Sequence, residues 1–298
     1  MPPSNFPTGF HHVGNCIRPP SEANSILLQA TLGCSHAKCT FCGAYKDKKF
    51  ALKDRKYLES DLEFASQYCR HQDRVFVMDG DAFAMPMKNW KWLLEQIREK
   101  LPWVKRTTCY ANLKSIMHKT DEDLAYLYGN GVKAVFLGLE SGHSQVRKDI
   151  RKGGTPEELI LHCKRLRKSG IRLITIVLLG LGQVDLSLEH ARETGRALTA
   201  IDPEAVSALS LMPLPDTPLG QAFEKGDFIL PDALGMISEL RELVQYTALT
   251  RGAFRSMHAS NYLSIDARFP QDKASVLQTL DQALAGNINL KPEWMRGL

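Results

Sequence analysis

Short apolar runs of strand length alternate with amphipathic runs of helix length from Ser25 onward. This alternation is typical of βα units on a parallel sheet, in which a helix follows each strand and covers it. Most of the runs are apolar at successive positions, as strands that are covered on both faces require. The sequence predicts six strands, at residues 26–31, 74–78, 107–111, 134–139, 173–178 and 205–211.

The repeating pattern stops at a proline-rich segment that contains Pro213, Pro215 and Pro218. We therefore predict an α/β fold with a partial (β/α)6 TIM-type barrel over residues 25–215. An N-terminal arm occupies residues 1–24 of this prediction. A mostly helical extension over residues 216–298, with helices near 232–250 and 272–285, caps the barrel.

Helix starts are predicted where a hydroxyl side chain precedes an acid by three residues, because the two can satisfy the first backbone N–H groups of a helix. Three such pairs are Ser60 with Glu63, Thr120 with Asp123, and Thr155 with Glu158.

The composition excludes two classes of protein. Hydrophobic residues make up 44% of the chain, which is ample for a folded core and excludes an intrinsically disordered chain. The longest apolar stretch, residues 171–181, is interrupted by Arg172 and Thr175 and is shorter than the roughly 20 residues of a membrane span. Residues 1–15 do not read as a secretory signal. We expect a cytoplasmic protein.

Three of the seven cysteines, Cys34, Cys39 and Cys42, lie together in a C-x4-C-x2-C segment that follows the first predicted strand. Thiolates at this spacing can bind zinc, copper or an iron-sulfur cluster, and His36 would be the fourth ligand of a zinc site. The isolated cysteines, Cys16, Cys69, Cys109 and Cys163, are interpreted as small core residues. Three ligands on a four-iron cluster would leave one iron open for substrate or cofactor.

At this point the sequence resembles the radical S-adenosylmethionine superfamily, in which a three-cysteine loop after the first strand of a partial (β/α)6 barrel holds a [4Fe-4S] cluster. Phe41, directly before the third cysteine, matches the aromatic residue that the family prefers there, with its backbone near the adenine of the cofactor. The spacing differs, since four residues separate Cys34 from Cys39 where the family most often has three.

The resemblance also implies further contacts to S-adenosylmethionine at the carboxyl ends of the strands. Asp79-Gly80-Asp81 resembles the motif for the methionyl amino group, and Glu140 with Ser141 resembles the segment for the ribose hydroxyls. Lys152 stands where oxygen-independent coproporphyrinogen oxidases carry a cation for the methionyl carboxylate, although Lys148 or Arg151 could serve instead. Gly180 resembles the glycine that approaches adenine. In those oxidases an acidic residue precedes this glycine, and Ile176 stands at its position in this sequence. Asn112 follows the third strand at the same rim.

The sequences of residues 18–22, 79–82 and 258–262 resemble those of a subgroup of short radical enzymes without an assigned reaction. The resemblance implies an oxygen-sensitive enzyme that cleaves S-adenosylmethionine reductively to a 5′-deoxyadenosyl radical, which then abstracts hydrogen from a substrate. It also implies an external electron donor of the flavodoxin or ferredoxin type. We assign no catalytic residue, and we predict that His258, Asn261 and Tyr262 contact the substrate as part of a lid.

Two alternatives stay open. The net charge of +5 concentrates in residues 46–56 and 147–168. With His36 as a ligand, these runs would suit a zinc-stabilised protein that binds or modifies RNA. A non-catalytic iron-sulfur electron carrier is the second alternative. We expect a small-molecule substrate rather than a nucleic acid, because the extension contains no recognisable RNA-binding module and would instead cap the barrel mouth.

Overall fold

Residues 9–297 are described by a computed structural model, so the first eight residues of the predicted N-terminal arm lie outside the description. The chain falls into two units, each of which has its own packing. The first comprises residues 1–37, 44–136 and 168–171, and the second comprises residues 38–43, 137–167 and 172–298.

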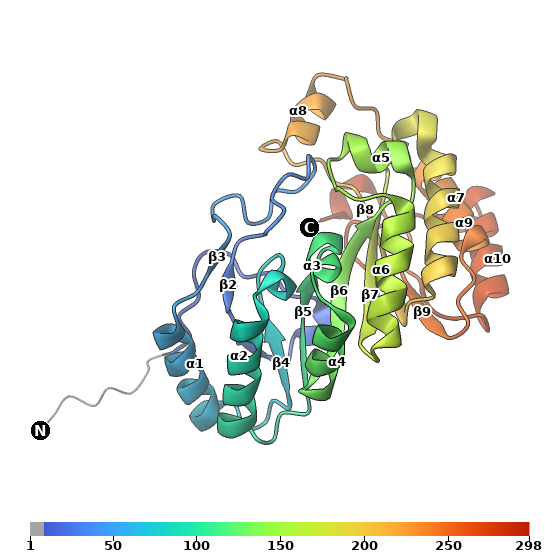
Figure 1. Cartoon of the computed structure of the whole chain (residues 1–298). Helices are drawn as coiled ribbons and strands as arrows, with labels where there is room; N and C mark the ends of the chain where they lie inside the picture. The colour runs from blue at the N-terminus through green and yellow to red at the C-terminus, as the bar shows by residue number, and fades with distance from the viewer. Residues whose placement is uncertain (1–8, 298) are drawn as a thin grey trace, which may run out of the picture. The chain divides into compact units, whose positions relative to one another are not determined.

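The first unit is a parallel sheet with helices against it (Figure 1). Its strands run in the order β1-β4-β5-β6, and Val75 of β4 lies opposite both Ile26 of β1 and Thr107 of β5. A short antiparallel pair, β2 with β3, flanks the cysteine segment. The strands are β1 (Ile26–Leu28), β2 (Thr31–Leu32), β3 (Ala51–Leu52), β4 (Arg74–Val77), β5 (Arg106–Ala111) and β6 (Val132–Glu140). The helices are η1 (Pro20–Glu22), α1 (Arg55–Tyr68), η2 (Ala82–Ala84), α2 (Met87–Lys100), α3 (Leu113–Met117) and α4 (Asp121–Gly129).

The second unit includes the end of β6 and has the strand order β6-β7-β8-β9-β10, with β8 parallel to both of its neighbours and β10 antiparallel to β9. Helices α7 and α9 lie side by side along it (Figure 1). The strands are β7 (Arg172–Leu179), β8 (Ala205–Ser210), β9 (Gly252–Arg255) and β10 (Asp266–Phe269). The helices are α5 (Ser144–Asp149), α6 (Pro156–Lys168), α7 (Gln183–Ile201), α8 (Pro218–Glu224), α9 (Ala233–Tyr246), α10 (Lys273–Leu284) and η3 (Glu293–Met295).

The predicted strands agree with the structure, with one division and three omissions, β3, β9 and β10. Residues 26–31 form two short strands, since β1 ends at Leu28 and Thr31 pairs with Leu52 of β3. The extension holds the helices α9 and α10 as predicted, but it also contributes β9 and β10. These four-residue strands escaped prediction because each buries so few side chains. Phe254 and Phe269, stacked with ring centroids 5.1 Å apart, supply much of their contact.

Two of the three predicted helix starts are confirmed. Thr120 and Asp123 form a reciprocal capping box at α4, and Thr155 with Glu158 makes the same exchange at α6. The prediction at Ser60 is wrong, because α1 begins at Arg55, where the Asp54 carboxylate accepts a hydrogen bond from the Lys56 N–H at 3.1 Å. An acid supplies the same acceptor as a hydroxyl, so the earlier cap prevails.

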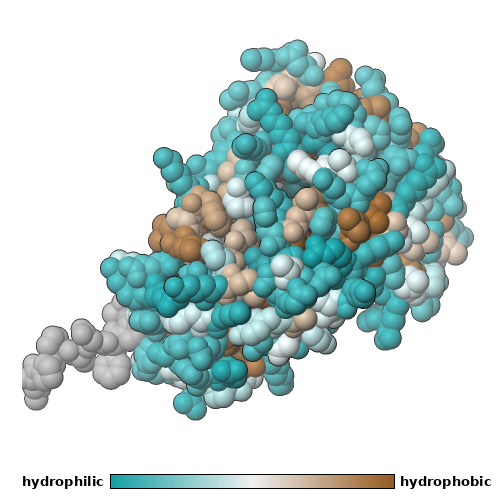
Figure 2. All heavy atoms as spheres, in the orientation of Figure 1, coloured by the Kyte–Doolittle hydropathy of each residue, from teal (hydrophilic) through white to brown (hydrophobic). Residues whose placement is uncertain are grey.

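Hydrophilic residues cover most of the face shown in Figure 2. Across residues 9–297, every helix is too short or too polar to pass through a lipid bilayer.

Candidate functional site

The residues predicted to bind the cluster or the cofactor follow the carboxyl ends of strands in both units. In the first unit they are Cys34, Asp79, Gly80, Asp81 and Asn112. In the second unit they are Cys39, Phe41, Cys42, Glu140, Ser141, Lys152 and Gly180, together with the predicted substrate residues His258, Asn261 and Tyr262.

The seven cysteines, all within the described residues, separate into two groups by exposure, and none is in a disulfide. Cys34, Cys39 and Cys42 are partly exposed, and so is Cys16. The remaining cysteines are buried, and burial raises the pKa of each of their thiols, to about 12 for Cys163. Buried thiols stay protonated and bind metals poorly, so the three clustered cysteines and Cys16 are the accessible thiols. The prediction of Cys16 as a core residue is therefore wrong. Within residues 9–297, no three or more His, Cys, Asp or Glu side chains lie close enough together to hold a metal ion.

Asp79 and Gly80 hold the backbone beside Cys34. The buried Asp79 carboxylate accepts hydrogen bonds from the Gly33 N–H at 2.7 Å and from Gln29 Nε2 at 3.1 Å. The Gly80 N–H donates to the Gly33 carbonyl at 3.1 Å. A Cβ at position 80 would lie 2.7 Å from the Cβ of Cys34, so only glycine permits this close approach. The segment therefore fixes where Cys34 begins its loop.

Asp81 holds the residue that follows Cys34, as Asp79 holds the residue that precedes it. Its buried carboxylate accepts hydrogen bonds from the Ser35 hydroxyl, from the Ser115 hydroxyl at 2.8 Å, and from the backbone N–H of Asn112 at 3.1 Å. Burial raises the pKa of Asp81. Asn112 caps α3 through its side-chain oxygen, which accepts from the Ser115 N–H at 2.9 Å. Both side chains are thus occupied within the protein, and a contact from either to the cofactor stays a prediction.

Tyr45 is a residue near Cys34 that the sequence did not single out. Its hydroxyl is buried and has no hydrogen-bond partner in the described part of the chain. Its ring would lie 2.9 Å from a Cβ at Gly80, the same atom that would collide with Cys34. Burial, followed by the nearby Tyr110 and Asp79, raises the pKa of Tyr45, so the hydroxyl keeps its proton. A buried donor without an acceptor is costly, and an anionic group bound beside Cys34 would supply the acceptor.

In the second unit, Glu140 and Lys152 meet as an ion pair with 3.0 Å between Oε1 and Nζ. Glu140 ends β6 with a φ of +62°, a left-handed conformation that costs a non-glycine residue energy and is found mostly at functional sites. The buried Arg147 supports this turn, since its guanidinium donates to the carbonyls of Leu139 and Ser141 at 2.9 and 3.0 Å. The structure therefore brings two predicted cofactor residues together.

Buried hydrogen bonds hold both Ser141 and Gly180. The Ser141 hydroxyl lies 2.8 Å from Nδ1 of His190. The Nε2 atom of His190 has the Leu178 carbonyl as its hydrogen-bond partner at 3.3 Å and lies 3.5 Å from Oε1 of Glu239. That carboxylate oxygen accepts a hydrogen bond from the Gly180 N–H at 2.7 Å, and the other oxygen accepts from the Ser187 hydroxyl. Burial lowers the pKa of His190 to about 4 and raises the pKa of Glu239 to about 7. The neutral imidazole fits a donor role at Nε2 and an acceptor role at Nδ1.

Phe41 packs against a buried apolar cluster that includes Ile150 and Leu181. A cavity of about 170 Å³ lies in the same region, lined by Thr40, Ile150, Leu181 and residues of α8. The Thr40 N–H donates to the Ile150 carbonyl at 3.0 Å and fixes the cysteine segment against α5. Phe41 and Leu181, the residue after Gly180, thus belong to the same apolar region, as contacts to one adenine would require.

The predicted substrate residues are held by different contacts. Asn261 is buried, and its amide donates to the carbonyls of Ala208 and Ser256 at 2.8 and 3.0 Å, so its side chain braces β8. Tyr262 is partly exposed, with the Arg296 guanidinium 4.1 Å from its ring centroid, and His258 hydrogen-bonds Ser260. Their contact with a substrate stays a prediction.

Residues 28–194, more than half of the chain, match the sequence profile of the radical SAM superfamily. The chain belongs to this superfamily. A [4Fe-4S] cluster, S-adenosylmethionine and an enzymatic role follow from that membership. The predicted family and fold class are confirmed, and a site of zinc alone is disfavoured.

One curated protein and two solved structures to which this radical SAM chain is similar share 15–24% sequence identity with it. It is 24% identical over 202 residues to a biotin synthase from Parafrankia sp. (strain EAN1pec), which covers 63% of this chain and 55% of that protein. The chain thus spans about half the length of that relative. The fold is similar to coproporphyrinogen III oxidase from Escherichia coli, with a TM-score of 0.56 and 15% identity over 74% of this chain and 51% of that one. It is also similar to a radical S-adenosylmethionine methyltransferase from Kitasatospora setae, with a TM-score of 0.55 and 20% identity over 67% of this chain and 39% of that one.

Sequence reasoning missed Tyr45 and Glu239. No local pattern marks Glu239, because it lies on a helix face among apolar residues 59 positions from its partner Gly180. Tyr45 carried one usable signal, its place three residues after the last clustered cysteine.

Proposed function

We propose that this protein uses a [4Fe-4S] cluster on Cys34, Cys39 and Cys42 to cleave S-adenosylmethionine reductively and abstract hydrogen from a small molecule. With one electron from an external donor, the bound cofactors supply methionine and a 5′-deoxyadenosyl radical, which takes a hydrogen atom from the substrate to give 5′-deoxyadenosine and a substrate radical. The observation that carries the proposal is the exposure of the three clustered thiols within a superfamily domain, while the other cysteines in β-strands and helices are buried.

The chain's own residues would bind and orient these groups. Asp79 and Asp81 hold Cys34 by fixing the residues on either side of it, and the Tyr45 hydroxyl offers an unused donor beside that thiol. This arrangement supports two roles for the Asp79-Gly80-Asp81 segment. Its side chains would shape the cysteine loop, and its backbone would bind the methionyl amino group.

Glu140 and Lys152 would take the polar ends of S-adenosylmethionine. Their ion pair is partly shielded from water, with side-chain exposures of 11% and 15%, so each charge is strong enough to attract a ligand group. On binding, Lys152 would turn to the methionyl carboxylate and Glu140 would accept hydrogen bonds from the ribose hydroxyls. Arg147 is excluded as the carboxylate ligand because its guanidinium is filled by backbone carbonyls.

Adenine would lie near Phe41 and Leu181, where the second unit has an apolar cluster and a cavity. Glycine at position 180 has a φ of +88° and permits the turn that presents its neighbours. A planar base gains from burial against apolar side chains. The network through Glu239 would keep this turn in place.

The substrate is proposed to be a small molecule enclosed by the C-terminal extension, with His258 and Tyr262 as the predicted contacts that are partly exposed. A cytoplasmic location and a flavodoxin-like or ferredoxin-like donor stay part of this proposal. Family membership favours the enzyme over the electron-carrier alternative.

Iron and sulfide analysis after anaerobic reconstitution tests the ligand assignment. Alanine at Cys34, Cys39 or Cys42 is expected to abolish iron binding, whereas alanine at the partly exposed control Cys16 is expected to retain iron at the wild-type level. Loss of iron in Cys16→Ala would show a cluster with four protein ligands and no open iron, which contradicts the proposal.

A further inference from the structure

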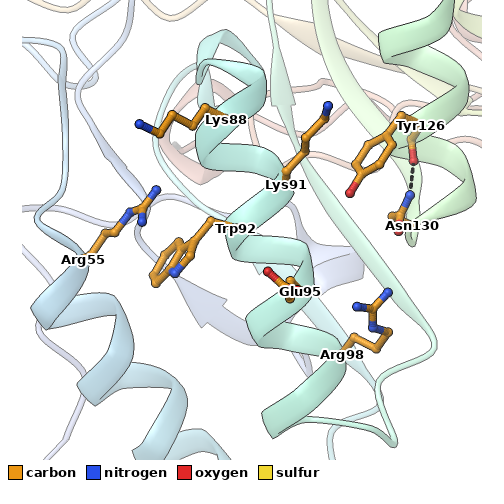
Figure 3. Close-up of a pocket in the computed structure, with 8 residues that line it drawn as sticks. All are labelled: Arg55, Lys88, Lys91, Trp92, Glu95, Arg98, Tyr126 and Asn130. Atoms are coloured by element: carbon orange, nitrogen blue, oxygen red, sulfur yellow. Dashed lines mark hydrogen bonds between the residues drawn. The ribbon is translucent and has the colours of Figure 1, made fainter.

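A groove of about 590 Å³ crosses the outer face of α2 in the first unit (Figure 3). It extends from α1 on one side to α4 on the other, and its volume is within the range of small-molecule sites. The lining residues are polar or aromatic: Arg55, Lys88, Lys91, Trp92, Glu95, Arg98, Tyr126 and Asn130.

Four cationic side chains and a single acid line this groove. Lys91 and Glu95 have the i,i+4 spacing of a helical ion pair, and Glu95 and Arg98 have the i,i+3 spacing, yet neither pair forms. Within the described residues, none of the four cations has a carboxylate within ion-pair distance. Like charges gathered in a concave surface repel one another, and a bound anion would relieve that repulsion.

Aromatic rings hold two of the cations at the edges of the groove. The Arg55 guanidinium lies 4.6 Å from the ring centroid of Trp92, and the Lys91 ammonium lies 5.0 Å from that of Tyr126. Figure 3 shows Trp92 directed toward Arg55 and Tyr126 beside Lys91. Asn130 braces the same turn of α4, because its amide donates to the Tyr126 carbonyl at 2.8 Å. Three of the four cations therefore lie on α2, and Arg55 adds the fourth from the start of α1.

We propose that this groove binds a phosphorylated small molecule of nucleotide size. The cations would contact the phosphate oxygens, as Lys and Arg do in phosphate sites, and the two rings would offer flat surfaces to a base. A single groove of this volume suits a mononucleotide better than an extended strand. The site is chemically unlike that for S-adenosylmethionine, because a sulfonium cation would be repelled by four cationic side chains.

Calorimetric titration of the purified protein without a reconstituted cluster tests this site independently of the radical chemistry. ATP is expected to bind with a stoichiometry of one at low ionic strength, pyrophosphate to bind more weakly, and adenosine not to bind. The double variant K88Q/R98Q is expected to weaken ATP binding roughly tenfold or more, the loss typical of charge-assisted hydrogen bonds. The control K164Q removes an exposed charge on α6, outside the groove, and is expected to leave ATP binding unchanged.

Three results would overturn the proposal. They are an absence of saturable ATP binding, an equal loss in K88Q/R98Q and K164Q, or tighter binding of a single-stranded oligonucleotide with a steep dependence on salt. The last would assign the groove to nucleic acid, since each phosphate contact on a single strand contributes about 0.7 to the slope of log affinity against log salt.

Discussion

The substitution E239Q is expected to change how stability depends on pH. Burial raises the pKa of Glu239 from 4.5 to about 7, so the folded protein keeps a proton that the unfolded chain releases above pH 4.5. Stability is therefore full below pH 4.5 and falls as the pH rises toward 7. A shift of this size corresponds to about 3 kcal/mol of unfolding free energy. Glutamine has the same shape and does not titrate, so the variant lacks this loss.

His190 contributes the opposite slope. Burial lowers its pKa from 6.5 to about 4, so the unfolded chain takes up a proton first as the pH falls, and stability is lost between pH 6.5 and 4. In the wild-type protein the two slopes offset each other between about pH 4.5 and 6.5. In E239Q only the His190 slope remains, and stability should rise by about 3 kcal/mol from pH 4 to 6.5.

Urea unfolding of the apoprotein at pH 5, 6, 7 and 8 measures both effects. The control is E242Q, because Glu242 lies on the same helix and its carboxylate pairs with Arg192 at the surface. Relative to wild type, E239Q should gain stability progressively from pH 5 to about 7 and then level off, whereas E242Q should differ by a constant amount. Parallel curves for wild type and E239Q would refute the raised pKa of the buried Glu239.

The remaining predictions concern the site itself. Glu140→Ala should retain iron but weaken S-adenosylmethionine binding by about 1.5 to 3 kcal/mol by calorimetry, and unchanged affinity would return Glu140 to a structural role. Tyr45→Phe removes a buried unpaired hydroxyl, so it should raise apoprotein stability by about 1 kcal/mol in urea unfolding. The same variant should bind the cofactors more weakly. A destabilised apoprotein would show that the hydroxyl has a partner. Gly80→Ala should lower the iron content of the reconstituted protein, since its Cβ would meet that of Cys34 at 2.7 Å, while Gly129→Ala, where a Cβ meets no atom within 4 Å, should load normally.

The parallel strands were predictable because most of them are apolar runs between helix-length segments, and their ends fall within two residues of the observed ones from Arg74 onward. The strands β9 and β10 were not predictable in this way. Four residues with one or two buried side chains give too short a pattern, and their place is fixed by pairing with β8 and by the stacked Phe254 and Phe269.

The site was predictable to the level of which segments reach the carboxyl ends of the strands. What each polar group contacts depends on how distant loops fold back, which residue types and spacing do not specify. Asp81 could bind a ligand or satisfy backbone and hydroxyl donors, and the structure gives it Ser35, Ser115 and Asn112 as partners. The pair of Glu140 with Lys152 was within reach of the sequence, because both were assigned to the same cofactor.

Formation of 5′-deoxyadenosine tests the central claim most directly. The anaerobically reconstituted protein is mixed with S-adenosylmethionine and dithionite, and the products are quantified by chromatography. We expect 5′-deoxyadenosine and methionine in equal amounts from the wild type and neither from Cys39→Ala, with Cys16→Ala as the matched active control. An iron-loaded wild-type protein that binds S-adenosylmethionine but releases no 5′-deoxyadenosine on reduction would contradict the account.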